Sequence, residues 1–222
     1  MDRGYNYLLA KMAERNAHPG REEEIDRALW AELGDRGAIL ASDSAGFTRI
    51  TRTRGTPHFL SMIQKGIAIS LPIIEQEGGV LVKQEADNML TTFPAPSAAL
   101  RAATRIVLDL RAHNESVADL DSRIHYSFGI GFGEFLRFSH DIFGDEVNVA
   151  SKLAEDTAQK EEVLLSKAAT DQLDELPERW SLAPWETVWH GGTELEYRKA
   201  AYPPPGPRAI SQDHSRPEKK KT

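Results

Sequence analysis

Residues 78–93 read GGVLVKQEADNMLTTF and predict a β-hairpin. Two short apolar strands, at 80–82 and 88–93, flank a charged tip that carries Lys83 and Asp87. Such a tip is exposed, and loops that are held by a rigid scaffold often carry chemistry. An isolated pattern of this kind is more often a solvated turn, so its meaning depends on the segments on either side.

The segment before the hairpin predicts a buried strand, a tight turn and a long helix. Residues 38–41 (AILA) are apolar, the small residues 42–46 (SDSAG) follow, and a helix begins at Phe47. Unpaired backbone N–H groups at such a junction can bind phosphate oxygens. The helical pattern resumes over 58–76, where Pro72 predicts a kink or a restart.

The segment after the hairpin predicts a helix, a strand and a second helix. An amphipathic helix is expected at 98–113 and a strand at 120–130. Glycines at 129, 131 and 133 lack the context of a dinucleotide-binding motif. After a short connection, a helix at 147–158 carries Asn148 and Lys152 on one face. A strand at 162–166, a helix at 167–174 and a hairpin formed by 185–189 and 194–199 complete the expected elements.

The order of these elements, β-α-β-β-α-β and then further elements, predicts an α+β domain with a ferredoxin-like, split βαβ or palm-like fold. The sheet is expected to be largely antiparallel, with helices on one face. Residues 1–36 predict an N-terminal helical extension, which we interpret as a packing, dimer-forming or autoregulatory appendage. Residues 37–200 form the main domain, and residues 201–222 are Pro-rich, polar and expected to be disordered.

The bulk composition excludes several classes of function. The 222 residues carry a formal net charge of −7, which disfavours a nucleic-acid partner. The absence of cysteine excludes disulfides and thiolate metal sites. No apolar run reaches the roughly 20 residues of a membrane helix, and the N-terminus does not resemble a signal peptide. We therefore expect a cytoplasmic protein without membrane insertion.

Two aspartates are expected to converge although they are far apart in the sequence. Asp43 follows the first strand and Asp87 lies at the hairpin tip, and these strands are neighbours in a split βαβ fold. Paired carboxylates beside a phosphate-binding turn suit Mg²⁺ or Mn²⁺ with a nucleoside triphosphate. The alternative for either aspartate is a purely structural role as a turn or helix-capping residue.

Three motifs together resemble class III adenylyl/guanylyl cyclase catalytic domains. The first is DSAGFT at 43–48, and the second is GGVLVKQEAD at 78–87. The third, DIFGDEVNVASK at 141–152, matches the family pattern D-x-x-G-x-x-V-N-x-A-x-R. The resemblance covers roughly residues 37–199 and implies the class III nucleotidyl cyclase fold.

The resemblance implies a metal and phosphate site. Asp43 and Asp87 would hold two Mg²⁺ or Mn²⁺ ions, with the Ser44 carbonyl as a further ligand. The backbone groups that would bind the triphosphate belong to Ala45, Gly46, Phe47 and Thr48.

The same resemblance implies a base and ribose site. Lys83 and Asp141 match the pair that recognises the purine, and their donor and acceptor pattern favours ATP. Asn148 would orient the ribose, and Lys152 would stabilise charge on the phosphates in the transition state. In this family two chains form each site head to tail, so the resemblance implies a homodimer and an inactive monomer.

The chain departs from the family pattern at three places. Ala86 replaces a glycine, which would be strained at a positive φ. Lys152 replaces an arginine and lacks its bidentate geometry. The connection at 134–140 is short, as in a compact bacterial subgroup.

Three functions remain open from the sequence. The first is an adenylyl cyclase that makes 3′,5′-cyclic AMP and pyrophosphate from ATP. The second is a catalytically weak or inactive nucleotide-binding regulatory module. The third is a cyclase for another nucleoside triphosphate. A diguanylate cyclase would need a G-G-[DE]-E-F signature, which the chain lacks.

Overall fold

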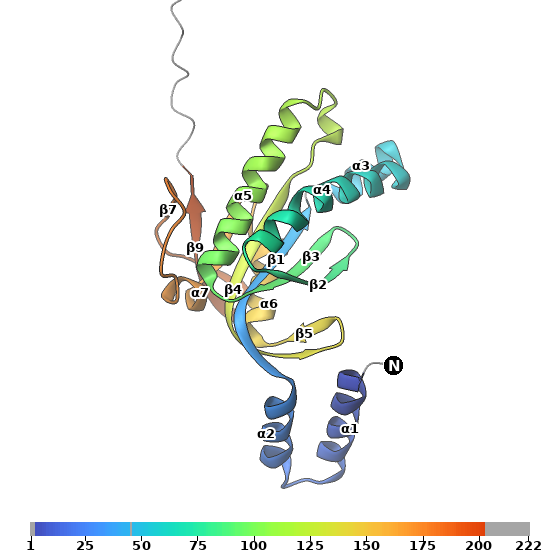
Figure 1. The fold of residues 1–222 in the computed structure, drawn as a ribbon, viewed down its shortest axis with the longest axis vertical. Coiled ribbons are helices and arrows are strands. Elements are labelled where there is room, and N and C mark those ends of the chain that lie inside the picture. Colours follow the sequence, from blue (N-terminus) through green and yellow to red (C-terminus); the bar gives the residue numbers. More distant parts are fainter. Residues whose placement is uncertain (1–2, 45, 203–222) are drawn as a thin grey trace, which may run out of the picture.

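The computed structural model describes residues 3–44 and 46–202, which fold around one large sheet (Figure 1). The helices of this part are α1 (Arg3–Ala17), α2 (Glu22–Leu33), α3 (Phe47–Arg54), α4 (Thr56–Gln76), α5 (Pro96–Glu115), α6 (Asp145–Lys152) and α7 (Lys167–Asp171). The strands are β1 (Gly34–Ser44), β2 (Val80–Glu85), β3 (Asn88–Phe93), β4 (Tyr126–Phe138), β5 (Asp141–Phe143), β6 (Val163–Ser166), β7 (Ser181–Leu182), β8 (Glu186–His190) and β9 (Thr193–Ala201). A 3₁₀ turn covers Leu120–Ser122, and a π-helical turn covers Leu153–Thr157.

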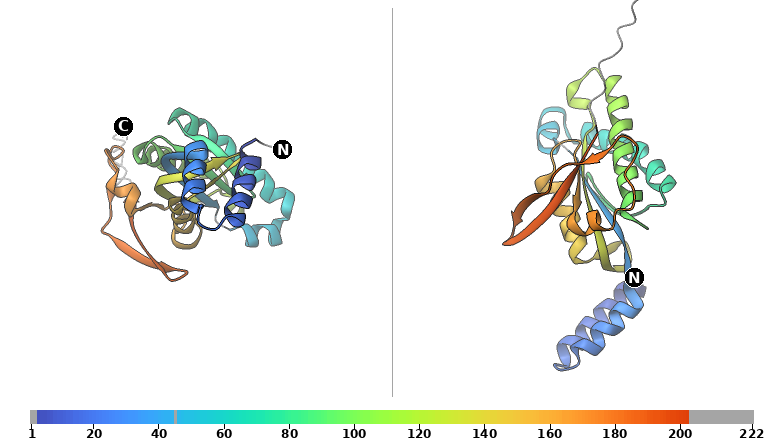
Figure 2. Two further views of the ribbon diagram at one scale, coloured as in Figure 1. Left: turned by 90° about the horizontal axis from the view of Figure 1, so that it is seen from below. Right: turned by 90° about the vertical axis from the view of Figure 1, so that its left-hand side faces the viewer.

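The sheet confirms the predicted ferredoxin-like arrangement. Its strand order is β2-β3-β1-β4-β6-β9-β7, with β5 paired to β4 and β8 paired to β9. The first four strands follow the split βαβ order, with α3 and α4 between β1 and β2 and α5 between β3 and β4. The pairs are antiparallel except for β4 and β6, which are parallel. The β8–β9 hairpin extends away from the rest of the sheet (Figure 2).

Helices cover both faces of the sheet, so the expectation of one covered face was wrong. Successive residues of β1 point to opposite faces. Leu40 belongs to the core under α4 and α5, whereas Ile39 and Ala41 belong to the core under α6. The unbroken apolar run of β1 is typical of a strand that is buried on both faces.

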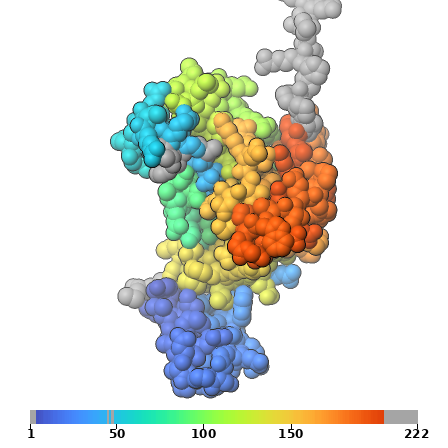
Figure 3. All heavy atoms as spheres, turned by 180° about the vertical axis from the view of Figure 1, so that it is seen from behind, coloured from blue at the N-terminus to red at the C-terminus, as the bar shows by residue number. Residues whose placement is uncertain are grey.

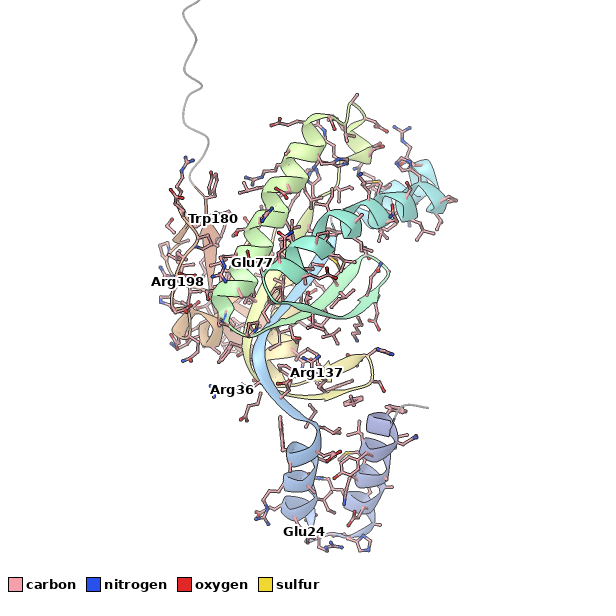
Figure 4. The ribbon with its side chains drawn as sticks, in the orientation of Figure 1. Glu24, Arg36, Glu77, Arg137, Trp180 and Arg198 are labelled. Carbon is pink, nitrogen blue, oxygen red and sulfur yellow. The ribbon has the colours of Figure 1, made fainter. Side chains whose placement is uncertain are left out.

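The N-terminal helices form a lobe at one end of the molecule (Figure 3). Ile25, Leu29 and Leu33 of α2 pack with Phe138 at the far end of β4. The helical part ends at Leu33, and the next residues, which the sequence assigned to the helical extension, begin β1. Figure 4 shows Arg36 and Arg137 where β1 leaves α2. Arg137 Nε donates to Asp35 Oδ2 at 2.9 Å and joins β4 to β1 there.

Several expected boundaries differ in the structure. Leu120–Ser122 is a 3₁₀ turn rather than the start of a strand. The expected connection at 134–140 is instead the end of β4 and the turn of the β4–β5 hairpin. The helix α4 continues through Pro72. The expected disordered segment lies outside the described residues from residue 203 onward. None of the described helices has the length and apolar content that a membrane span requires.

Gly129 lets α6 approach the centre of the sheet, because a Cβ there would overlap the backbone of the helix. It would collide with the Ala150 carbonyl oxygen and lie 2.8 Å from the Ala154 nitrogen. We expect Gly129→Ala to lower the free energy of unfolding by about 2 kcal/mol or more, measured by denaturant unfolding. Gly133→Ala is the matched control on the same strand. Its Cβ would meet only side-chain atoms of Glu146, at 3.1 Å or more, so equal losses in the two variants would contradict this account.

Candidate active site

Asp43 and Asp87 are brought together by the pairing of β1 with β3. Asp43 lies near the end of β1, and Asp87 lies in the turn between β2 and β3. The hydroxyl of Ser44 donates to Asp87 Oδ2 at 2.5 Å and links the two segments. The predicted convergence of the aspartates is therefore present within one chain.

The aspartate pair lies in a negatively charged environment. Burial, followed by the negative charges of Asp87 and Glu155, raises the pKa of Asp43 to about 6. Two carboxylates that repel one another are hard oxygen donors of the kind that Mg²⁺ and Mn²⁺ prefer. Within residues 3–44 and 46–202, no group of three or more acidic, histidine or cysteine side chains has the arrangement of a metal cage. The two carboxylates therefore fit a cation whose remaining ligands come from a bound phosphate group.

The turn that carries Asp87 is strained at Ala86. Glu85 pairs with Asn88, so Ala86 and Asp87 form a two-residue hairpin turn. Ala86 has a φ of 52°, and the Gln84 side chain donates to its carbonyl oxygen at 3.1 Å. Glycine adopts this conformation without the steric cost that a Cβ brings. The expected effect of the missing glycine is thus present as backbone strain.

We expect Ala86→Gly to raise the free energy of unfolding by about 0.5–1 kcal/mol. Relief of strain outweighs the greater entropy that glycine has in the unfolded chain. The midpoint of thermal unfolding would rise by about 1–4 °C. The same exchange at the exposed helical Ala13 should instead destabilise the protein, and destabilisation at both sites would refute the strain at Ala86.

Lys83 and Asp141 form the polar centre of a cavity of about 220 Å³. Lys83 Nζ donates to Asp141 Oδ2 at 2.9 Å, and Glu85 lies 3.5 Å from the same nitrogen. Burial lowers the pKa of Lys83, but the hydrogen bond and charge of Asp141 outweigh it, so the pKa is raised. The cavity therefore offers one charged donor and one charged acceptor side by side. The cavity lies between the β2–β3 hairpin, β5 and α6. Its helical side is formed by Val147, Asn148 and Ser151 of α6 and by Glu155 of the following π-helical turn.

The structure does not bring Lys152 into this cavity. Its ammonium group donates to Asp156 Oδ2 at 2.7 Å on the exposed side of the helix. Asn148 lines the cavity together with Lys83 and Asp141. The residues predicted for base and ribose binding are thus together, whereas Lys152 is held by a partner on its own helix.

The predicted phosphate-binding turn is described only in part. Gly46 has a φ of 102° and precedes the first turn of α3, where Phe47 and Thr48 lie. Ala45 lies outside the described residues. A helix that starts beside Asp43 agrees with the strand–turn–helix junction expected from the sequence.

Glu155 is a cavity residue that the sequence interpretation missed. It accepts a hydrogen bond from Asn88 Nδ2 at 3.3 Å, and it raises the pKa of Asp43. Its position seven residues after Asn148 places it two turns further along the same face. The spacing of seven residues could have predicted that Glu155 lies near Asn148. It could not have predicted the π-helical turn that follows α6.

Known proteins resemble this chain in both sequence and structure. No family model matches it. A protein named adenylate cyclase from Streptomyces coelicolor is 31% identical over 167 residues, which cover 74% of this chain and 39% of that protein. The chain therefore spans about two fifths of the length of this curated relative.

Two solved structures share the fold. The adenylate/guanylate cyclase/hydrolase from Silicibacter pomeroyi has a TM-score of 0.63 and 28% identity, covering 77% of this chain and 98% of that one. The guanylyl cyclase Cya2 has a TM-score of 0.65 and 20% identity, covering 77% and 94%. The relatives thus include proteins named for either purine nucleotide.

Proposed function

We propose that this chain, which belongs to the class III adenylyl/guanylyl cyclase family of catalytic domains, converts ATP to 3′,5′-cyclic AMP and pyrophosphate. The observation that carries the proposal is the Lys83–Asp141 pair in a cavity that Asn148 also lines. These three residues come from separate elements, β2, β5 and α6, and line one cavity. The domain assigned to this activity is residues 37–200.

The choice of ATP rests on hydrogen-bond polarity. Adenine has an acceptor at N1 and a donor at N6, which suit the Lys83 ammonium and the Asp141 carboxylate respectively. Guanine presents a donor at N1 and an acceptor at O6, which oppose both groups. The pair would open to admit the base, since its two members now bond to one another.

Asp43 and Asp87, with the Ser44 carbonyl, would hold two Mg²⁺ or Mn²⁺ ions per site. When bound, these ions would neutralise phosphate charge and activate the 3′-hydroxyl of the ribose. The chain's own part is to keep the two carboxylates adjacent, which the bond from Ser44 to Asp87 supports. The junction at Gly46–Thr48 would bind phosphate oxygens through backbone N–H groups.

The complete site is proposed to form between two copies of the chain. Asp43 and Asp87 of one copy would meet the base-binding cavity of the other, which gives a homodimer two equivalent sites. Asn148 would orient the ribose. Lys152 would stabilise the transition-state charge on the phosphates after leaving Asp156 for the substrate.

A weak or inactive nucleotide-binding module is the second candidate. It is favoured by the strained Ala86 beside Asp87 and by the engagement of Lys152 with Asp156. A lysine also lacks the two-pronged phosphate contact of arginine. A cyclase for another nucleoside triphosphate is the third candidate.

The deciding experiment supplies ATP, GTP, CTP and UTP separately to the purified chain with Mg²⁺ or Mn²⁺. Cyclic products are identified by mass spectrometry, and nucleotide binding is measured by calorimetry. Cyclic AMP as the main product supports the proposal. Binding of ATP without turnover supports the module, and a different cyclic nucleotide supports the third candidate.

A further inference from the structure

Glu146 joins three elements beneath the candidate site. It lies in the first turn of α6, and one of its oxygens, Oε2, accepts two hydrogen bonds. The Ser166 hydroxyl of β6 donates at 2.7 Å, and the Phe132 backbone N–H of β4 donates at 3.1 Å. A single carboxylate oxygen therefore attaches α6 to two strands of the sheet.

The glycine-rich part of β4 makes room for this attachment. A Cβ at Gly131 would lie 3.0 Å from Glu146 Oε2 and would also overlap the Glu146 carbonyl oxygen. A Cβ at Gly133 would lie 3.1 Å from Glu146 Cγ. Gly131 and Gly133 thus make room for the first turn of α6.

The attachment continues beyond Glu146. The oxygen of Ser166 also accepts a hydrogen bond from the Ala169 backbone N–H at 3.1 Å, at the start of α7. The Ser166 hydroxyl thus accepts one bond and donates the other, and Glu146 is the acceptor of its proton. Burial raises the pKa of Glu146, and the two donated bonds oppose this rise. An acceptor at this half-buried position is costly to place and serves to fix geometry.

We propose that Glu146 is a positioning residue that sets the orientation of the cavity-facing side of α6. It precedes Asn148 by two residues, and Gly144 alone separates its helix from β5, which begins at Asp141. The motif of the third stretch leaves this position unspecified. The expected effect of Glu146 on turnover rests on the proposed function. Its expected effect on the orientation of α6 does not.

The test compares Glu146→Ala, Glu146→Gln and Asn114→Ala. The amide oxygen of glutamine can accept both bonds, because both now go to one oxygen. Asn114 is the matched control, since its buried side chain also makes two bonds, to the backbone of Ile124 at 2.7 and 2.9 Å, away from the cavity. We expect Glu146→Ala to lower kcat about tenfold to a hundredfold with KM within about threefold. Glu146→Gln should stay within about threefold of the parent chain for both constants.

Amide hydrogen exchange supplies a readout that does not need activity. Faster exchange in a peptide covering residues 145–152 is expected for Glu146→Ala and not for Asn114→Ala. Equal exchange and equal kcat in these two variants would overturn the proposal. So would a Glu146→Gln variant as impaired as Glu146→Ala, since the charge rather than the acceptor would then matter. If the parent chain shows no turnover, the proposed function fails, and hydrogen exchange alone tests the role of Glu146. Faster exchange confined to α6 in Glu146→Ala supports that role, and an increase spread evenly over the chain contradicts it.

Discussion

Replacing Asp43 by alanine is expected to lower kcat for cyclic nucleotide formation by at least about a thousandfold, equivalent to about 4 kcal/mol of barrier. One of the two carboxylates proposed to hold the metal ions would be lost, and Asp87 alone would remain beside Ser44. Initial rates under saturating nucleotide and metal give the comparison directly.

The same variant should keep or gain stability, which separates a functional role from a structural one. The raised pKa means that burial and Asp87 disfavour the charged form of Asp43 in the folded protein. At pH values above the pKa that Asp43 has in the unfolded chain, its negative charge opposes folding. Removal of that charge is therefore expected to stabilise the folded protein. Asp109→Ala on α5 is the control for loss of an exposed carboxylate. A thermal midpoint lowered together with activity, or more than about a tenth of the activity retained, would contradict the assignment.

The framework of this site could be predicted from apolar patterns. Residues 38–41 are an apolar run, and residues 88–93 combine apolar residues with strand-favouring threonines. Their order with the long helices is enough for a split βαβ fold. That topology places the end of β1 beside the β2–β3 turn, so the meeting of Asp43 with Asp87 follows from it. The pairing of Lys83 with Asp141 was reached through resemblance, and the structure shows the contact.

The contacts that tune the site could not be predicted in the same way. The partner of Lys152 depends on which of several acidic residues the turn after α6 brings within reach, and a π-helical turn changes that spacing. Glu146 carries no apolar signal, and its two donors come from strands far away in the sequence. Helix α6 covers the second face of the sheet. It follows the βαββαβ unit in the sequence and packs on the face that this unit leaves open, so the order of the unit alone did not predict it.

Mixing two inactive variants is expected to restore about a quarter of the parent activity. Asp43→Ala damages the proposed metal half, and Asn148→Ala damages the ribose half. In a head-to-tail dimer each site takes one half from each chain, so a mixed dimer holds one intact site and one doubly damaged site. Random pairing makes half of the dimers mixed, and therefore about a quarter of all sites are intact. The two chains would be coexpressed, purified together and assayed against each variant alone.

A pair damaged in the same half is the control that makes this result decisive. Asp43→Ala mixed with Asp87→Ala leaves every site with one damaged aspartate, so no recovery is expected whatever the pairing. Asp43 and Asp87 are neighbours in one chain, joined through Ser44, which is why they must count as a single half. Recovery in the Asp43→Ala and Asn148→Ala mixture but not in this control requires a site shared between chains. If neither mixture exceeds the sum of its separate variants, each chain uses its own cavity with its own aspartates, and the proposed homodimeric site is wrong.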